Sequence, residues 1–257
     1  KIKKLVNINR LDKKIEKIFY KIKPIFIVGV PRCGSTLVEK IITSGAKQLP
    51  AGEETGIFSS LVKKKMLKKH NLNSDIENFQ EKLVEKYKQK GLIREKSDYT
   101  FTDKSLDNFF YLGLIQKSFF NAKIIDCRRN VLSCIISILK NNLTKLPWAH
   151  NLEHIFKYFD IYYKMIKNYK KNYPNLIYEL EYEKLVTNPE IESKKLMKFC
   201  ELPWDKKCLE FYKRKDLYSK TASNIQVRSE IYKSSVDKYL PYKQFLSKYG
   251  KIYSWFK

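Results

Sequence analysis

The spacing of apolar residues along the first fifty positions predicts a helix, a buried strand and a second helix. Apolar side chains recur every three or four residues over 1–23, which is typical of an amphipathic helix. Pro24 ends this pattern, and residues 25–30 are a continuous apolar run of the kind found in buried parallel strands. After a tight loop, a helical pattern starts at Leu37 and ends near Gly45.

Strand and helix patterns alternate through most of the remaining chain. Residues 55–90 predict two exposed helices with lysine clusters. Strand patterns cover 99–102, 123–127 and 176–182, and helical patterns cover 106–120, 131–139, 151–173 and 191–199. This order predicts an α/β domain over 24–257, with a parallel sheet flanked by helices, behind a separate N-terminal helix over 1–23.

Near the C-terminus the regular pattern disappears over 213–238, a stretch rich in Ser, Tyr and Lys. A segment of this length without regular structure is usually disordered or a functional loop. A last helix is predicted over about 236–249.

The composition narrows the class of protein. The chain has 257 residues, of which 43% are apolar, so it can bury a substantial core. No apolar run reaches the roughly 18 residues of a membrane span, so we expect a soluble protein. Five cysteines without a C-x-x-C pair, and only three histidines, favour neither a disulfide framework nor a metal site. We therefore expect no metal and a reducing, cytoplasmic location.

The formal net charge of +25 raises the question of nucleic-acid binding, but only seven of the 52 basic residues are Arg. Arg is the side chain best shaped for forked phosphate contacts, so this composition favours a solvated lysine surface over a nucleic-acid interface. The charge would still concentrate anionic ligands. Because Arg is scarce, the position of each one is informative.

The loop after the first strand carries the most specific chemistry. Residues 29–36, Gly-Val-Pro-Arg-Cys-Gly-Ser-Thr, nearly match the phosphate-binding pattern G-x-x-x-x-G-K-[ST], with Ser35 in place of the lysine. The glycines let successive N–H groups and the following helix start surround a phosphate. The loop lacks the lysine that reaches the β and γ phosphates of a triphosphate. Arg32, Ser35 and Thr36 could instead bind a ligand that has one phosphate and one further anionic group. The competing interpretation is a strand-to-helix turn that is merely rich in glycine.

Residues 25–37, IFIVGVPRCGSTL, resemble the 5′-phosphosulfate loop of sulfotransferases that use 3′-phosphoadenosine 5′-phosphosulfate. The resemblance is strongest to the protein-tyrosine sulfotransferases and to bacterial relatives that often carry tetratricopeptide repeats. It implies a P-loop NTPase-like sulfotransferase fold. It also implies that Arg32, Cys33, Gly34, Ser35 and Thr36 hold the 5′ end of the nucleotide. Cys33 departs from the usual Ser of this loop.

Further positions extend the resemblance along the chain. Arg129 and Ser137 have the spacing of the residues that hold the 3′-phosphate in these enzymes. The alternative is an exposed ion pair at the adjacent Arg128 and an interior helix serine at Ser137, and we favour the phosphate-binding interpretation. Glu54 matches the catalytic base, with a solvated helix cap as its alternative. Lys104 matches the lysine that stabilises the leaving group. Tyr182 matches a tyrosine near adenine, or is simply a core residue.

The irregular C-terminal stretch resembles the loop that covers the nucleotide in the bacterial relatives. The matching sequence, TASNIQVRSEIYKSSVDKY, spans residues 221–239. By this match Ser223 and Lys238 contact the nucleotide, and Gln226 and Arg228 support it. Contacts with a bound anionic nucleotide would also order a loop of this length.

Together these features predict a metal-independent transferase of the sulfuryl group from 3′-phosphoadenosine 5′-phosphosulfate to a hydroxyl, leaving adenosine 3′,5′-bisphosphate. Glu54, Lys104 and Arg32 are its predicted catalytic residues. The positive charge suits an acidic peptide or an anionic sugar as acceptor, with a tyrosyl or sugar hydroxyl as the reacting group. Two alternatives stay open. One is a P-loop kinase or NTPase, suggested by the hydrophobic strand that ends in Asp126. The other is a basic RNA-binding protein that uses lysines and 18 tyrosines.

Overall fold

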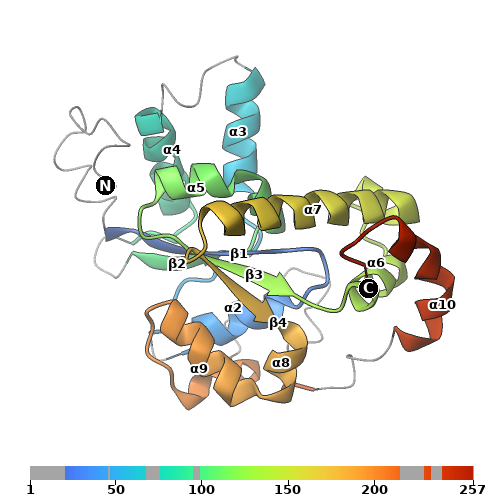
Figure 1. The fold of residues 1–257 in the computed structure, drawn as a ribbon. Helices are drawn as coiled ribbons and strands as arrows, with labels where there is room; N and C mark the ends of the chain where they lie inside the picture. Colours follow the sequence, from blue (N-terminus) through green and yellow to red (C-terminus); the bar gives the residue numbers. More distant parts are fainter. Residues whose placement is uncertain are drawn as a thin grey trace.

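A four-stranded, wholly parallel sheet forms the centre of the protein (Figure 1). The structure is a computed structural model, and it describes residues 21–45, 47–67, 76–94, 99–214, 229–232 and 239–256. The strands are β1 (Lys23–Gly29), β2 (Thr100–Asp103), β3 (Lys123–Arg128) and β4 (Ile177–Glu181). Their spatial order is β2-β1-β3-β4, so the chain leaves β1 first toward β2 and later returns to its other side. In such sheets, ligands bind beside the carboxyl end of the strand where the direction reverses, which here is β1.

Helices cover both faces of the sheet, as the sequence predicted. Figure 1 shows α3 (Ile57–Leu67), α4 (Ile76–Gln89), α5 (Leu112–Ser118) and α7 (Leu152–Asn172) on one side. It shows α2 (Ser35–Ser44), α8 (Tyr182–Thr187) and α9 (Pro189–Phe199) on the other. Helix α6 (Val131–Lys140) follows β3, and α10 (Lys243–Leu246) lies near it at the C-terminal end. The expected α/β architecture with a parallel sheet is therefore confirmed.

Short 3₁₀ segments connect these elements. They are η2 (Leu106–Tyr111), η3 (Pro147–His150), η4 (Lys206–Cys208), η5 (Phe211–Lys213), η6 (Leu240–Tyr242) and η7 (Ser247–Lys251). Two helix predictions were wrong because 3₁₀ segments occupy part of the predicted ranges. In place of the helix expected over 106–120, the structure has η2 followed by α5. In place of the helix expected over 236–249, the described residues from 239 onward form η6, α10 and η7. At η2 the Asp103 carboxylate accepts from Ser105 N and Asn108 Nδ2, which tightens the first turn.

The two lysine-rich helices are less exposed than their sequence indicated. Phe58 on α3 and Phe79, Leu83 and Tyr87 on α4 are completely buried. They pack edge-on and tilted against the aromatic core around Phe26 of β1. The prediction of two exposed helices was therefore wrong for their inner faces, because many lysines lowered the average hydropathy of a stripe that still buries bulky side chains.

The remaining helices differ from prediction mainly at their ends. Helix α8, which begins directly after β4, was not predicted, because its six residues are too short for a periodic pattern. The predicted N-terminal helix over 1–23 lies almost entirely outside the described residues, and β1 already begins at Lys23.

Candidate nucleotide-binding and catalytic site

The carboxyl ends of the four strands bring the predicted site residues to one edge of the sheet. Arg32 follows β1, Lys104 follows β2, Arg129 follows β3 and Tyr182 follows β4. Parallel strands end at the same edge, so residues that are far apart in the sequence converge there. This convergence is the structural basis of the site.

The loop between β1 and α2 has the curled backbone that its glycines predicted. Gly34 caps α2 with a φ of 94°, and Arg32 has a φ of 72°, so two residues of this short loop adopt left-handed conformations. A Cβ added to Gly34 would lie 2.4 Å from Cδ2 of Tyr182. Only glycine therefore fits between the loop and that ring. Ser35 and Thr36 follow in the first turn of α2, where backbone N–H groups have no partner within the helix.

The Cys33 side chain points beneath the loop. It is 1% exposed, and a Cβ on Gly29 would lie 2.6 Å from its Sγ. Its hydrogen bond with Cys127, followed by burial, raises the pKa of the Cys127 thiol. Cys33 can thus contribute to a ligand site only through its backbone, and the thiol that replaces the usual serine belongs to the core.

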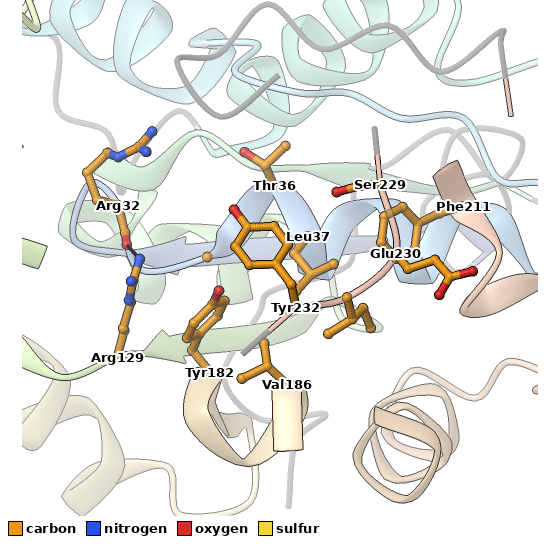
Figure 2. Close-up of a pocket in the computed structure, with 12 residues that line it drawn as sticks. Arg32, Thr36, Leu37, Arg129, Tyr182, Val186, Phe211, Ser229, Glu230 and Tyr232 are labelled. Carbon is orange, nitrogen blue, oxygen red and sulfur yellow. Dashed lines mark hydrogen bonds between the residues drawn. The ribbon is translucent and has the colours of Figure 1, made fainter. Parts of the chain in front are cut away.

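A pocket open to solvent lies against this loop and is lined by both Arg32 and Arg129 (Figure 2). Of the predicted residues, Arg32, Gly34, Thr36, Arg129 and Tyr182 line it, whereas Cys33, Ser35 and Ser137 do not. The remaining lining residues are Leu37, Val186, Phe211, Ser229, Glu230, Ile231 and Tyr232.

The two arginines meet at one end of this pocket. The Nη1 of Arg129 donates to the Arg32 carbonyl oxygen at 3.1 Å, and the Nε of Arg32 donates to Ser137 Oγ at 2.8 Å (Figure 2 shows the first of these bonds). Burial and then the positive charge of Arg129 lower the pKa of Arg32. The Arg129 guanidinium thus contacts the backbone of Arg32, and two arginines that line one partly buried pocket favour an anion as ligand.

Tyr182 forms a wall of the pocket. Tyr182 is 8% exposed. Its ring lies between Gly34 and Arg129, whose Cζ is 4.6 Å from the ring centroid. A tyrosine ring in this position offers a flat apolar surface beside the Arg129 cation. Its predicted place near adenine stays a prediction.

Lys104 and Glu54 pair with each other at the carboxyl end of β2. The Lys104 side chain is completely buried, and its Nζ lies 3.4 Å from Oε1 of Glu54, which is 58% exposed. The two residues do not line the pocket itself. The pair places a buried cation next to a carboxylate that solvent or an acceptor can reach.

A buried carboxylate that the sequence analysis missed connects this pair to the phosphate loop. Glu39 lies one helical turn after Thr36, and its Oε1 accepts from Glu53 N at 2.9 Å and from Thr102 Oγ1 at 2.8 Å. Its Oε2 is 4.0 Å from Lys104 Nζ. Burial raises the pKa of Glu39, and Lys104 opposes that rise. Helix α2 therefore links the pocket to the Lys104–Glu54 pair.

Asp126 does not have the environment of a magnesium ligand. Its Oδ2 accepts from Arg128 Nε at 2.7 Å and lies 3.3 Å from Lys170 Nζ, and its Oδ1 accepts from the Tyr162 hydroxyl. These cations and the phenol already occupy both carboxylate oxygens. This observation weakens the kinase and NTPase alternative, for which Asp126 was the main support.

Part of the predicted site cannot be placed. Ser223, Gln226, Arg228 and Lys238 lie outside the described residues. Residues 229–232 of the same stretch are described, and all four line the pocket. The sequence analysis quoted this stretch but did not single out Tyr232, and Phe211 carried no motif that could have indicated it.

The described residues contain no helix with the length and apolar character that crossing a membrane requires. They also contain no cluster of three His, Cys, Asp or Glu side chains suited to a metal ion.

Comparison with known proteins adds independent findings. The model of the sulfotransferase family matches residues 24–206. An uncharacterized protein of Aquifex aeolicus (strain VF5) is 35% identical over 239 residues, which are 88% of this chain and 31% of that protein. The chain thus spans about a third of the length of this relative.

Two solved structures share the fold. The sulfotransferase domain from the Synechococcus PCC 7002 olefin synthase has a TM-score of 0.61 at 18% identity, over 85% of this chain and 87% of that domain. The sulfotransferase domain from the curacin biosynthetic pathway has a TM-score of 0.62 at 17% identity, over 88% of this chain and 98% of that domain.

Proposed function

Since the chain belongs to the sulfotransferase family, we propose that it transfers a sulfuryl group from 3′-phosphoadenosine 5′-phosphosulfate to a hydroxyl acceptor. The observation that carries the proposal is a single pocket that contains the glycine loop, Arg32 and Arg129. A nucleotide with phosphate groups at both the 5′ and 3′ positions needs two anion-binding positions within the reach of one ribose. The loop and the arginines supply them.

The described residues fit this nucleotide in shape as well as in charge. At Gly34 a Cβ would collide with Tyr182, so glycine lets the loop pass close to this ring at the edge of the pocket. The backbone N–H groups at the start of α2, with the hydroxyl of Thr36, face one phosphate. The ring of Tyr182 and the side chains of Val186 and Phe211 give the pocket an apolar part suited to adenine.

When bound, 3′-phosphoadenosine 5′-phosphosulfate supplies the sulfuryl group, whose bond to the bridging phosphate oxygen breaks as a bond to the acceptor oxygen forms, leaving adenosine 3′,5′-bisphosphate and a sulfate ester. Lys104 holds positive charge where the leaving oxygen becomes negative. Glu54 takes the proton of the acceptor hydroxyl. Glu39 Oε2, 4.0 Å from Lys104 Nζ, helps to hold this lysine in place.

The acceptor is proposed as a class. Glu54 is the exposed member of its pair, so the acceptor hydroxyl approaches from solvent and covers this carboxylate as it binds. The net charge of +25 favours an anionic acceptor, such as an acidic peptide with a tyrosyl hydroxyl or an anionic sugar.

The direct test is transfer of labelled sulfate from 3′-phosphoadenosine 5′-phosphosulfate, in the presence of a metal chelator, to a panel of simple phenols, tyrosine-containing acidic peptides and anionic oligosaccharides. We expect labelled ester with at least one class, and no label with the Lys104→Met variant. Transfer of phosphate from Mg²⁺-ATP to the same panel, with no sulfate transfer, would overturn the proposal. So would salt-sensitive RNA binding that survives Arg32→Ala and Arg129→Ala in a protein without transferase activity.

A further inference from the structure

The segment that carries Glu54 lies directly against the end of β2. The backbone N–H of Lys104 donates to the Glu53 carbonyl oxygen at 2.8 Å. A Cβ added to Gly52 would lie 2.0 Å from the Thr102 carbonyl oxygen, so only glycine allows this close approach. The backbone on which Glu54 is carried is therefore placed relative to the strand that leads to Lys104.

The turn just before Glu54 needs support. Glu53 has a φ of 52°, a left-handed conformation that residues with a side chain rarely adopt. Such a conformation persists only where the surrounding contacts hold it. Both backbone groups of Glu53 are held: its carbonyl oxygen by Lys104 N, and its N–H by Oε1 of Glu39 at 2.9 Å. The direction in which the chain enters Glu54 therefore depends on Glu39.

The same carboxylate also faces the other member of the pair. Glu39 is 1% exposed, and its Oε2 lies 4.0 Å from Lys104 Nζ. Its Oε1 accepts a second hydrogen bond, from Thr102 Oγ1 at 2.8 Å, which fixes the orientation of the carboxylate. One buried side chain thus contacts the backbone next to Glu54 with one oxygen and faces the ammonium of Lys104 with the other.

This arrangement matters because Glu54 has little packing of its own. It is 58% exposed, whereas its partner Lys104 is completely buried at 3.4 Å. An exposed glutamate side chain has several rotamers, so its backbone is what brings the carboxylate back to the same place. Reacting groups must be held closely, since an error of about 1 Å can cost about 10²-fold in rate.

We propose that Glu39 is a positioning residue of the sulfuryl transfer, which sets the separation of the Glu54 carboxylate and the Lys104 ammonium. It does so by anchoring Glu53 N and by facing Lys104, and it does not line the pocket. This inference rests on the proposed function and assigns a role to a residue that carried none in the sequence analysis.

The test is steady-state transfer of sulfate, with adenosine 3′,5′-bisphosphate affinity measured on the same proteins by calorimetry. Glu39→Ala removes both contacts and should lower kcat about 10- to 100-fold, while the affinity changes less than about 3-fold. Glu39→Gln keeps a carbonyl oxygen that can accept from Glu53 N and Thr102 Oγ1. Its kcat should therefore fall less than about 5-fold.

Gln80→Ala is the matched control for the loss of a buried side chain that joins two elements. Gln80 is 4% exposed, and its Nε2 donates to the carbonyl oxygens of Lys117 and Ser118 at the end of α5. Because β3 follows α5, this bond lies toward the amino ends of the strands, opposite the site. Gln80→Ala should lower the melting temperature and leave kcat unchanged.

Hydrogen–deuterium exchange tests the anchor without any transfer reaction. Glu39→Ala should speed exchange in peptides that cover residues 50–56, because Glu53 N–H loses its acceptor, and Glu39→Gln should not. In the Glu54→Gln background, Glu39→Ala should lower kcat less than it does in wild type, because the carboxylate that it positions is absent. Fully additive losses would overturn the positioning role.

A second variant covers the case in which Glu39→Ala does not fold, as judged by its melting curve. Thr102→Val then removes the hydroxyl that orients Glu39 and should lower kcat about 3- to 10-fold, whereas Thr102→Ser should behave as wild type. Equal kcat values for the two Thr102 variants would overturn the role.

The remaining contrary results separate this inference from the proposed function. The positioning role is overturned, and the proposed function stands, if Glu39→Ala transfers sulfate as fast as wild type. The same holds if Glu39→Gln is as slow as Glu39→Ala, or if bisphosphate affinity falls as much as kcat. A wild-type protein that transfers sulfate to no acceptor of the panel would overturn the proposed function, and this role with it.

Discussion

Replacing Gly34 with alanine perturbs the phosphate loop at its tightest point. Gly34 has a φ of 94°, a conformation that costs an L-residue about 1–2 kcal/mol. The new Cβ would also lie 2.4 Å from Tyr182 Cδ2 and 3.0 Å from Cε2, so the ring or the loop must move. Crowding of this kind typically costs about 1–3 kcal/mol. The sum is a destabilisation of about 2–5 kcal/mol.

Gly91 provides a matched control for the backbone contribution. It also has a left-handed φ, of 71°, but an added Cβ would meet nothing within 4 Å. Gly91→Ala should therefore cost only about 1–2 kcal/mol, or a fall in melting temperature of about 2–8 °C for a chain of this size. Gly34→Ala should lower the melting temperature further and weaken adenosine 3′,5′-bisphosphate at least about 10-fold, whereas Gly91→Ala leaves that affinity unchanged.

Thermal unfolding and calorimetric titration of both variants test this reasoning. Tyr182→Ala should cost less stability in the Gly34→Ala background than in wild type, because it removes the colliding ring. The reasoning is refuted if Gly34→Ala is no less stable than Gly91→Ala and binds the bisphosphate normally.

Three further predictions concern Glu54, the cysteines and Glu201. Glu54→Gln should lower sulfate transfer about 10²-fold or more in a steady-state assay while leaving bisphosphate affinity unchanged, and equal activity would exclude Glu54 as the base. All five cysteines are buried, so native protein should react slowly with a thiol reagent and release five thiols only in denaturant; a rapidly reacting thiol would contradict the described packing. The hydrogen bond from Lys123 to Glu201, and then the positive charge of Lys123, lower the pKa of Glu201 in the folded protein. The ionised Glu201 therefore stabilises the fold at pH values above its ordinary pKa of about 4.3. This stabilisation is lost as the pH falls through the lowered pKa of the folded state. The melting temperatures of wild type and Glu201→Gln should accordingly differ at neutral pH and converge in acid, and a constant gap would refute the linkage.

The elements that position the site could be predicted because their signals are local. The apolar run of β1, the glycines of the following loop and the helical pattern of α2 are continuous in sequence, and each appears in the structure close to its predicted place. Arg129 could be predicted to lie near this loop because it follows another buried strand of the same parallel sheet.

The contacts that give those residues their roles could not be predicted. Glu39 meets Lys104 only because α2 packs beside β2, and its position within a helical pattern gives no sign of a buried carboxylate. The left-handed backbone of Arg32 directs its side chain to α6, which no spacing in the sequence indicates. Asp126 resembled a metal ligand as long as the positions of Arg128, Tyr162 and Lys170 were unknown.

The central claim is that the glycine loop and Arg129 hold two phosphates of one nucleotide in one pocket. Its most direct measurement is calorimetric titration of the wild-type chain with adenosine 3′,5′-bisphosphate in the presence of a metal chelator, with Arg129→Ala as the comparison. The account predicts binding of one nucleotide per chain without metal, at least about 10-fold weaker in Arg129→Ala. Binding of Mg²⁺-ATP alone, or bisphosphate binding that Arg129→Ala leaves unchanged, would contradict it.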